Sequence, residues 1–152
     1  MSDRQADLRA LYQSVILEHN RSPHNRGAVS EETHRARGFN PLCGDDITVS
    51  MRIADGQITE VGFEGKGCAI CTAAASCMTQ ACDGRGPEQV IAVAADFEAM
   101  VRGGDTRPSV GLLEAFAPVA GFPSRIKCAI LPWRALVHAL NGDEGIATTE
   151  EP

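Results

Sequence analysis

Hydrophobic and polar residues follow a helical pattern in four parts of the chain. Residues 6–19 place apolar side chains at helical spacing, and residues 87–100 carry a similar apolar face. Residues 71–82 are rich in alanine, which has the highest helix propensity. We expect the last helix to begin just after Cys128, because Pro132 is tolerated in a first helical turn, where its missing N–H needs no partner.

Alternation of apolar and polar residues predicts two strands between the first two helices. Residues 47–53 and 57–63 both alternate, and Asp55-Gly56 supplies a tight turn between them. The two strands therefore form a β-hairpin with one buried face, and a loop precedes it. Helices packed on one side of a small antiparallel sheet make the expected fold class α+β.

The length of the chain fits a single domain. With 152 residues, it can bury an ordinary hydrophobic core without disulfides or a structural metal. We expect one domain over residues 1–140 and a flexible acidic tail over residues 141–152, where the sequence is polar and contains glycine. Any bound metal is then expected to serve a function rather than to hold the fold together.

Charge and cysteine content narrow the class of function. A net charge of −6 and a pI of about 5.1 argue against a nucleic-acid partner, since Lys and Arg make most phosphate contacts. No window approaches the roughly 20 apolar residues of a membrane span, and the N-terminus has no apolar signal core. We therefore expect a cytoplasmic protein whose six cysteines are kept reduced for metal or sulfur chemistry.

Three cysteines are expected at the mouths of secondary-structure elements. Cys43 lies in a turn, and Cys68 and Cys128 each precede a predicted helix, whose N-terminus lowers the pKa of a nearby thiol. Asp45 follows Cys43 across Gly44, which permits a bend that turns both side chains toward one centre. Three thiolates and a carboxylate suit zinc or an iron–sulfur cluster, and spacing does not choose between them. The alternative is a purely structural role, in which these cysteines are small core residues and the aspartate caps a turn.

The other three cysteines fall in the predicted Ala-rich helix. Core packing is the expected role of Cys77 and Cys82. Cys71 is ambiguous, because Cys68-Ala-Ile-Cys71 is a Cys-x-x-Cys sequence that could be a redox pair, yet no thioredoxin-like βαβ pattern surrounds it.

Three motifs, taken in order, resemble the U-type iron–sulfur cluster assembly family. They are residues 40–45 (NPLCGD), 63–68 (FEGKGC) and 125–129 (RIKCA). The opening segment, residues 11–27, is also similar, so the resemblance runs from about residue 8 to residue 140. It implies a SufE/NifU-like α+β fold, with a sheet of about three strands and the metal site at one end.

Within that family the chain is similar to the SufU branch rather than to the IscU scaffolds. Lys127 stands where scaffolds usually carry a histidine, and residues 84–122 form a longer stretch than in scaffolds. This resemblance implies a zinc-dependent acceptor of persulfide sulfur. Its implied partners are a pyridoxal-phosphate cysteine desulfurase of the SufS kind and a SufBCD-type scaffold.

The resemblance also assigns roles to residues. It implies that zinc is bound by Cys43, Asp45, Cys68 and Cys128, and that Cys43 is the catalytic sulfur acceptor. In that mechanism the partner supplies a histidine to zinc, which releases Cys43 to attack the persulfide. The alternative is an IscU-like scaffold that assembles and transfers a [2Fe-2S] cluster, with iron or the cluster at the same residues; Lys127 counts against it.

Overall fold

The computed structural model describes residues 3–150. The chain begins with one helix, continues through three consecutive strands and ends in helices. In order, the elements are α1 (Asp3–Arg21), β1 (His34–Asn40), β2 (Asp45–Ala54), β3 (Gln57–Lys66), α2 (Ala69–Cys82), α3 (Pro87–Val101), the 3₁₀ segment η1 (Pro108–Gly121) and α4 (Pro123–Asn141).

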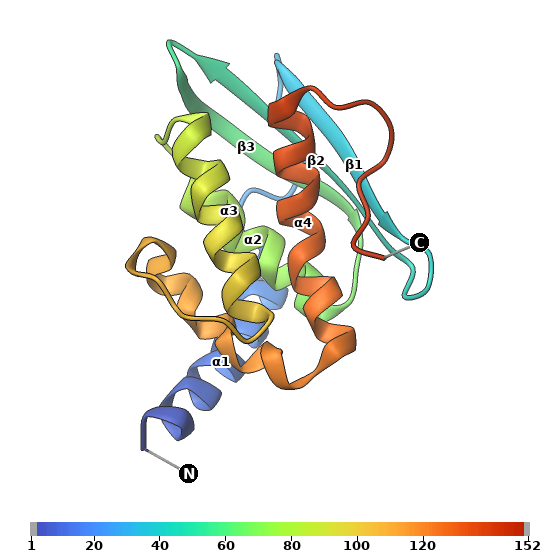
Figure 1. Ribbon diagram of the computed structural model, residues 1–152. Coiled ribbons are helices and arrows are strands. Elements are labelled where there is room, and N and C mark those ends of the chain that lie inside the picture. Colours follow the sequence, from blue (N-terminus) through green and yellow to red (C-terminus); the bar gives the residue numbers. More distant parts are fainter. Residues whose placement is uncertain (1–2, 151–152) are drawn as a thin grey trace.

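The three strands form one antiparallel sheet in the order β1-β2-β3, and α2, α3 and α4 lie on one side of it (Figure 1). The central strand β2 turns Ile47, Val49 and Met51 into the core, where all three are buried. Helix α4 packs over β1 and β2, and α2 packs over β3. The expected hairpin and the α+β class are confirmed.

The strand β1 was expected from the resemblance but not from the hydrophobic pattern, which indicated a loop. Its inward positions include Gly38 and Asn40, two residue types that are depleted in strands. Gly38 is needed there because a Cβ atom would lie 3.0 Å from Cδ1 of Leu131 on α4. The close approach of α4, rather than strand propensity, therefore explains the sequence of β1.

The predicted start of the last helix is wrong. Helix α4 begins at Pro123, which occupies its first turn, and Pro132 lies inside the helix. The first-turn rule for proline applies to Pro123 and not to Pro132, to which the sequence prediction had applied it. Cys128 is consequently a helical residue and is buried rather than placed before the helix.

The segment after α4 differs from the flexible tail expected over residues 141–152. Residues 142–150 run back along the edge strand β1 (Figure 1). Ala147 donates its N–H to the carbonyl of Arg37 and accepts the N–H of Phe39, each at 2.9 Å. An edge strand offers unpaired backbone groups, and this segment uses them. The last two residues of the expected tail lie outside the described part of the chain.

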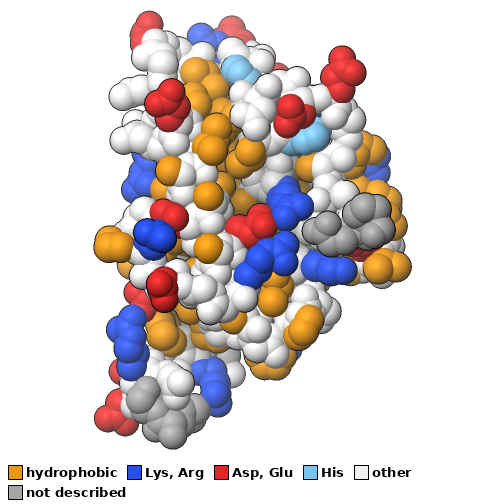
Figure 2. Space-filling view, viewed as in Figure 1, with side chains coloured by type: hydrophobic (Ala, Val, Ile, Leu, Met, Phe, Trp, Pro, Cys, Tyr) orange, Lys and Arg blue, Asp and Glu red, His pale blue; other side chains and the backbone are white. Residues whose placement is uncertain are grey.

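Acidic and basic side chains are interspersed on the face that carries α3 and α4 (Figure 2). Glu98 on α3 lies 2.9 Å from Arg134 on α4 and 3.1 Å from Arg102. Several charges on this face are therefore neutralised locally. Among the described helices, none is long and apolar enough to cross a membrane.

Gly62 on β3 packs closely against the backbone of the loop that contains Asn25 and Gly27, so a substitution at Gly62 tests this packing. A Cβ atom there would lie 2.4 Å from the carbonyl oxygen of Gly27. We expect Gly62→Ala to lower the free energy of unfolding by about 1–3 kcal/mol, because backbone must shift to admit the methyl group. Urea denaturation would measure this. Gly121→Ala is the control, since a Cβ atom there meets nothing within 4 Å; equal stability of the two variants would contradict the packing.

Candidate metal centre

Cys43 lies in the tight turn between β1 and β2. The turn closes through a 2.8 Å hydrogen bond from the N–H of Gly44 to the carbonyl of Asn40, and Gly44 adopts a φ of 76°, which favours glycine. The Cys43 side chain is exposed, and its Sγ lies 3.3 Å from Oδ2 of Asp45. The turn therefore directs an accessible thiol toward a carboxylate.

Asp45 is the first residue of β2 and is only 1% exposed. Its Oδ1 accepts the backbone N–H of Cys68 at 2.9 Å, and its Oδ2 faces the thiol of Cys43. A buried carboxylate needs such partners, because burying an unpaired charge is costly. Asp45 thus joins the start of β2 to the start of α2.

Cys68 is the N-cap of α2, and its Sγ accepts the N–H of Cys71 at 3.4 Å. The preceding Gly67 leaves room for this arrangement. A Cβ atom on Gly67 would lie 2.9 Å from Sγ of Cys71 and 3.6 Å from Oδ1 of Asp45. Absence of a side chain at this position therefore lets the end of β3 and the start of α2 close around the site.

The structure brings three of the four expected ligands together directly. Ligand atoms of Cys43, Asp45 and Cys128 all lie within 4.8 Å of one another. Cys68 is outside that group of three, although its thiol is hydrogen-bonded to Cys128 and its N–H to Asp45. A tetrahedral zinc ion with ligands at about 2.0–2.3 Å separates them by roughly 3.3–3.8 Å. The 3.3 Å between Cys43 and Asp45 fits that size.

The thiols of the site have different acidities, and one expectation fails here. The hydrogen bond with Cys128 lowers the pKa of the Cys68 thiol to about 6. The same bond and burial raise the pKa of Cys128, whereas its expected place before a helix predicted a lowered value. Burial also raises the pKa of Cys43. Among the three thiols of the metal-free site, Cys68 is therefore the one that ionises most readily.

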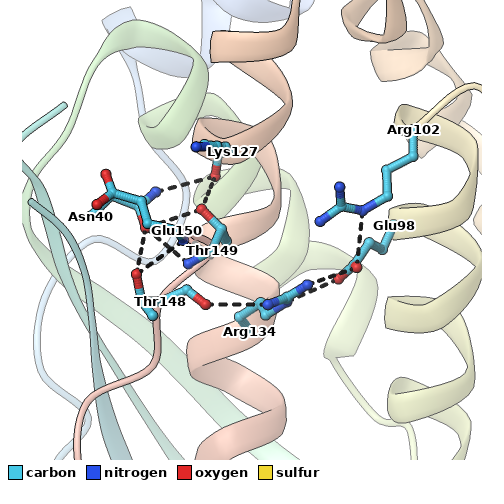
Figure 3. Close-up of polar contacts among 8 residues, drawn as sticks. All are labelled: Asn40, Glu98, Arg102, Lys127, Arg134, Thr148, Thr149 and Glu150. Atoms are coloured by element: carbon cyan, nitrogen blue, oxygen red, sulfur yellow. Dashed lines mark hydrogen bonds and ion pairs between the residues drawn. The ribbon is translucent and has the colours of Figure 1, made fainter. Parts of the chain in front are cut away.

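The C-terminal segment contacts Asn40, the residue whose backbone carbonyl closes the Cys43 turn, through Thr148 and Thr149 (Figure 3). Asn40 is fully buried, and its Oδ1 accepts hydrogen bonds from Oγ1 of Thr148 at 3.2 Å and from both N and Oγ1 of Thr149 at 3.0 Å. Oγ1 of Thr149 also contacts the carbonyl of Lys127, next to Cys128. The pattern of apolar residues carried no signal for this clamp, but Asn40 opens the NPLCGD motif.

A further contact reaches the turn itself. Oε1 of Glu150 accepts the N–H of Leu42, the neighbour of Cys43, at 2.7 Å. The segment that was expected to be flexible therefore positions the backbone of the metal site on one side.

The site opens onto a groove of about 720 Å³ between α1 and the start of α4. Its lining includes the thiols of Cys43, Cys68 and Cys128, together with Tyr12 and Arg125. The guanidinium of Arg125 in this lining lies over the ring of Phe122, 4.3 Å from its centroid. The three thiols are therefore reached from the surface through this groove.

The remaining three cysteines are partly or fully buried, as expected of core residues. Cys71 differs from the other two in its location. Cys82 is fully buried and Cys77 is half-buried, and burial raises the pKa of both thiols to about 12. Cys71 is also buried, but it lies beside the metal site rather than in the distant core.

Comparison with known proteins gives one family. Residues 11–129 match the family model of the NifU-like N-terminal domain. The zinc-dependent sulfurtransferase SufU of Bacillus subtilis is 40% identical over 143 residues, covering 92% of this chain and 96% of that protein. The cluster assembly scaffold IscU of Streptococcus pyogenes is 37% identical over 135 residues, covering 88% and 84%.

A solved structure agrees with these sequence matches. The SUF-system cluster assembly scaffold of Fervidobacterium islandicum superposes with a TM-score of 0.81 at 28% identity, covering 86% of this chain and 97% of that chain. The likeness in fold therefore extends over most of this chain and nearly all of that one.

The unequal acidities of the thiols predict an order of alkylation. In protein freed of metal by a chelator, we expect iodoacetamide to modify Cys68 with a midpoint near pH 6, because its pKa is lowered to about 6. Cys43 should react only at higher pH than an ordinary thiol, because its pKa is raised. Mass spectrometry of peptides across a pH series would measure both midpoints.

The variant Cys128→Ala isolates the cause of this order. It removes the hydrogen bond that lowers the pKa of Cys68, so the midpoint for Cys68 should move upward. An unchanged midpoint, or faster modification of Cys43 than of Cys68 at neutral pH, would contradict the assignment.

Proposed function

The chain belongs to the family of NifU-like N-terminal domains, and on that basis we propose that it serves iron–sulfur cluster assembly as a zinc-dependent acceptor of persulfide sulfur. The observation that carries the proposal is the convergence of Cys43, Asp45 and Cys128 beside the thiol of Cys68. The name of the Bacillus subtilis relative, which aligns along almost its full length, supports the same activity.

The proposed zinc ligands are Cys43, Asp45, Cys68 and Cys128. Three sulfur donors and one carboxylate oxygen suit the tetrahedral preference of zinc, and the 3.3 Å between Sγ of Cys43 and Oδ2 of Asp45 suits its size. When bound, zinc supplies positive charge that keeps the thiols deprotonated at neutral pH. The ligands differ in freedom, since Asp45 is held by the N–H of Cys68 and Cys43 lies in an exposed turn.

Cys43 is the proposed acceptor because its thiol is both accessible and placed on a turn that contains Gly44. The Cys43 thiolate attacks the outer sulfur of a cysteine persulfide on the partner enzyme. A new sulfur–sulfur bond forms at Cys43, the bond within the partner's persulfide breaks, and the partner's cysteine leaves as a thiolate. Asp45, Cys68 and Cys128 keep their places during this exchange.

The proposed partner is a pyridoxal-phosphate cysteine desulfurase of the SufS kind, and the groove beside the thiols is where its sulfur-bearing loop would enter. Arg125, whose guanidinium stacks over Phe122 at 4.3 Å, would attract the anionic persulfide. A SufBCD-type scaffold is the proposed recipient of the sulfur. Six free cysteines suit a reducing compartment, so we propose a cytoplasmic location.

The acceptor role predicts the behaviour of a single variant. Adding the zinc-loaded protein to a cysteine desulfurase and cysteine should raise the turnover of the enzyme, and Cys43→Ala should reduce that turnover to the rate of the enzyme alone. Alanine and sulfide production would measure the turnover. Cys77→Ala is the control, because Cys77 lies away from the site. No stimulation by the zinc-loaded protein would refute the proposal.

The second candidate is a scaffold that builds a [2Fe-2S] cluster at the same residues, and the Streptococcus pyogenes relative named IscU favours it. We expect the purified protein to hold about one zinc ion per chain and to stimulate the desulfurase. Metal analysis measures the zinc. Anaerobic reconstitution that gives a stable visible absorption spectrum, and transfer of the cluster to an apoprotein, would favour the scaffold instead.

A further inference from the structure

Cys68 and Cys71 form a Cys-x-x-Cys pair at the start of α2. Cys68 is the N-cap, and Cys71 donates its N–H to Sγ of Cys68 at 3.4 Å. An N-cap residue and the residue three positions after it span the first helical turn, which places their Cα atoms about 5–6 Å apart. A disulfide requires about 4.4–6.8 Å between Cα atoms. The backbone therefore permits a disulfide here without refolding the helix.

The two thiols differ in access. Cys68 is exposed and lines the groove, whereas Cys71 is 1% exposed. Only the missing side chain of Gly67 makes room for the thiol of Cys71, since a Cβ atom there would lie 2.9 Å from its Sγ. The same Cβ atom would lie 3.6 Å from Oδ1 of Asp45. Cys71 therefore sits at the edge of the metal site, behind an exposed cysteine.

This pairing of an exposed and a buried thiol suits a reaction in two steps. We propose that Cys68 and Cys71 are a redox-active dithiol that closes to a disulfide when a hydroperoxide reaches the groove. Cys68 attacks the peroxide, its sulfur gains a hydroxyl group, and the other oxygen leaves as water or an alcohol. The Cys71 thiol then attacks the Cys68 sulfur, the sulfur–sulfur bond forms, and water leaves.

The reaction oxidises two thiols and reduces one peroxide, so its atoms and electrons balance. Its consequence, which rests on the proposed zinc site, is the withdrawal of Cys68 from the metal. The disulfide also protects Cys68 from further oxidation to a sulfinic acid, which ordinary thiols do not reverse. The dithiol would therefore make loss of the metal under oxidation reversible.

Cys128 is the competing partner, because its thiol is hydrogen-bonded to Cys68. It lies on α4, in the group that converges with Cys43 and Asp45. The Cys71 thiol is on the same helix as Cys68, and its backbone is already hydrogen-bonded to the Cys68 sulfur. Closure within one helical turn is thus favoured over a bridge between two helices.

The test uses the full chain freed of metal and treated with an equimolar amount of hydrogen peroxide. Free thiols are blocked with N-ethylmaleimide, disulfides are reduced, and the released thiols are labelled with iodoacetamide. Fragmentation of the peptide should find the second label on Cys68 and Cys71. In Cys71→Ala this label should be lost and Cys68 should stop at a sulfenic acid that dimedone traps, whereas the matched control Cys77→Ala should behave as the unaltered protein.

The zinc-loaded protein gives a second measurement. Peroxide should release zinc from the unaltered protein, and dithiothreitol with added zinc should restore it, whereas Cys71→Ala should fail to recover. A second label on Cys68 together with Cys128 or Cys43, or the same label pattern in Cys71→Ala, would overturn the proposal. If the chain binds no zinc, the proposed function is refuted. The labelling of Cys68 and Cys71 in the metal-free protein still shows whether these two residues form a disulfide.

Discussion

The hydrogen bond from the N–H of Cys68 to Oδ1 of Asp45 is the contact on which the metal site depends. Asp45 starts β2 and Cys68 starts α2, so this 2.9 Å contact fixes the strand and the helix relative to each other at one point. The carboxylate is buried and its second oxygen faces Cys43. Because a buried charge must be paired, the site holds together even before a metal arrives.

The same corner is braced from the opposite side by the C-terminal segment. The hydroxyl groups of Thr148 and Thr149 donate hydrogen bonds to the buried side-chain oxygen of Asn40. The backbone carbonyl of Asn40 accepts the N–H of Gly44 and so closes the turn that carries Cys43. Hydrogen bonds of this kind are individually modest, about 1 kcal/mol each, but they converge on one residue. Cys43, the proposed acceptor, is therefore the exposed residue of a turn that these contacts hold in place.

Local sequence patterns predicted the helices and strands that have a regular apolar face. They missed the elements whose residues are determined by contacts with other parts of the chain. The hairpin of β2 and β3 and the helices α2 and α3 carry clear patterns. The strand β1 does not, because Gly38 was selected by the approach of α4. The start of α4 was misplaced because the first-turn rule was applied to Pro132, which lies inside the helix, rather than to Pro123. The docking of residues 142–150 uses backbone groups of β1 and scattered polar side chains, which no apolar pattern records.

The site shows the same division between what spacing can and cannot predict. The motifs predicted a site of Cys43, Asp45, Cys68 and Cys128, and the structure brings Cys43, Asp45 and Cys128 together. The acidity of each thiol follows from its partners in space. Cys128 was expected to be acidic before a helix, and instead it lies inside α4, where its proton stabilises the thiolate of Cys68. A site that holds its charge on the N-capping Cys68 leaves the exposed Cys43 protonated until a metal binds. In the proposed function, metal binding and sulfur acceptance at Cys43 are thereby coupled through the contacts of the protein itself.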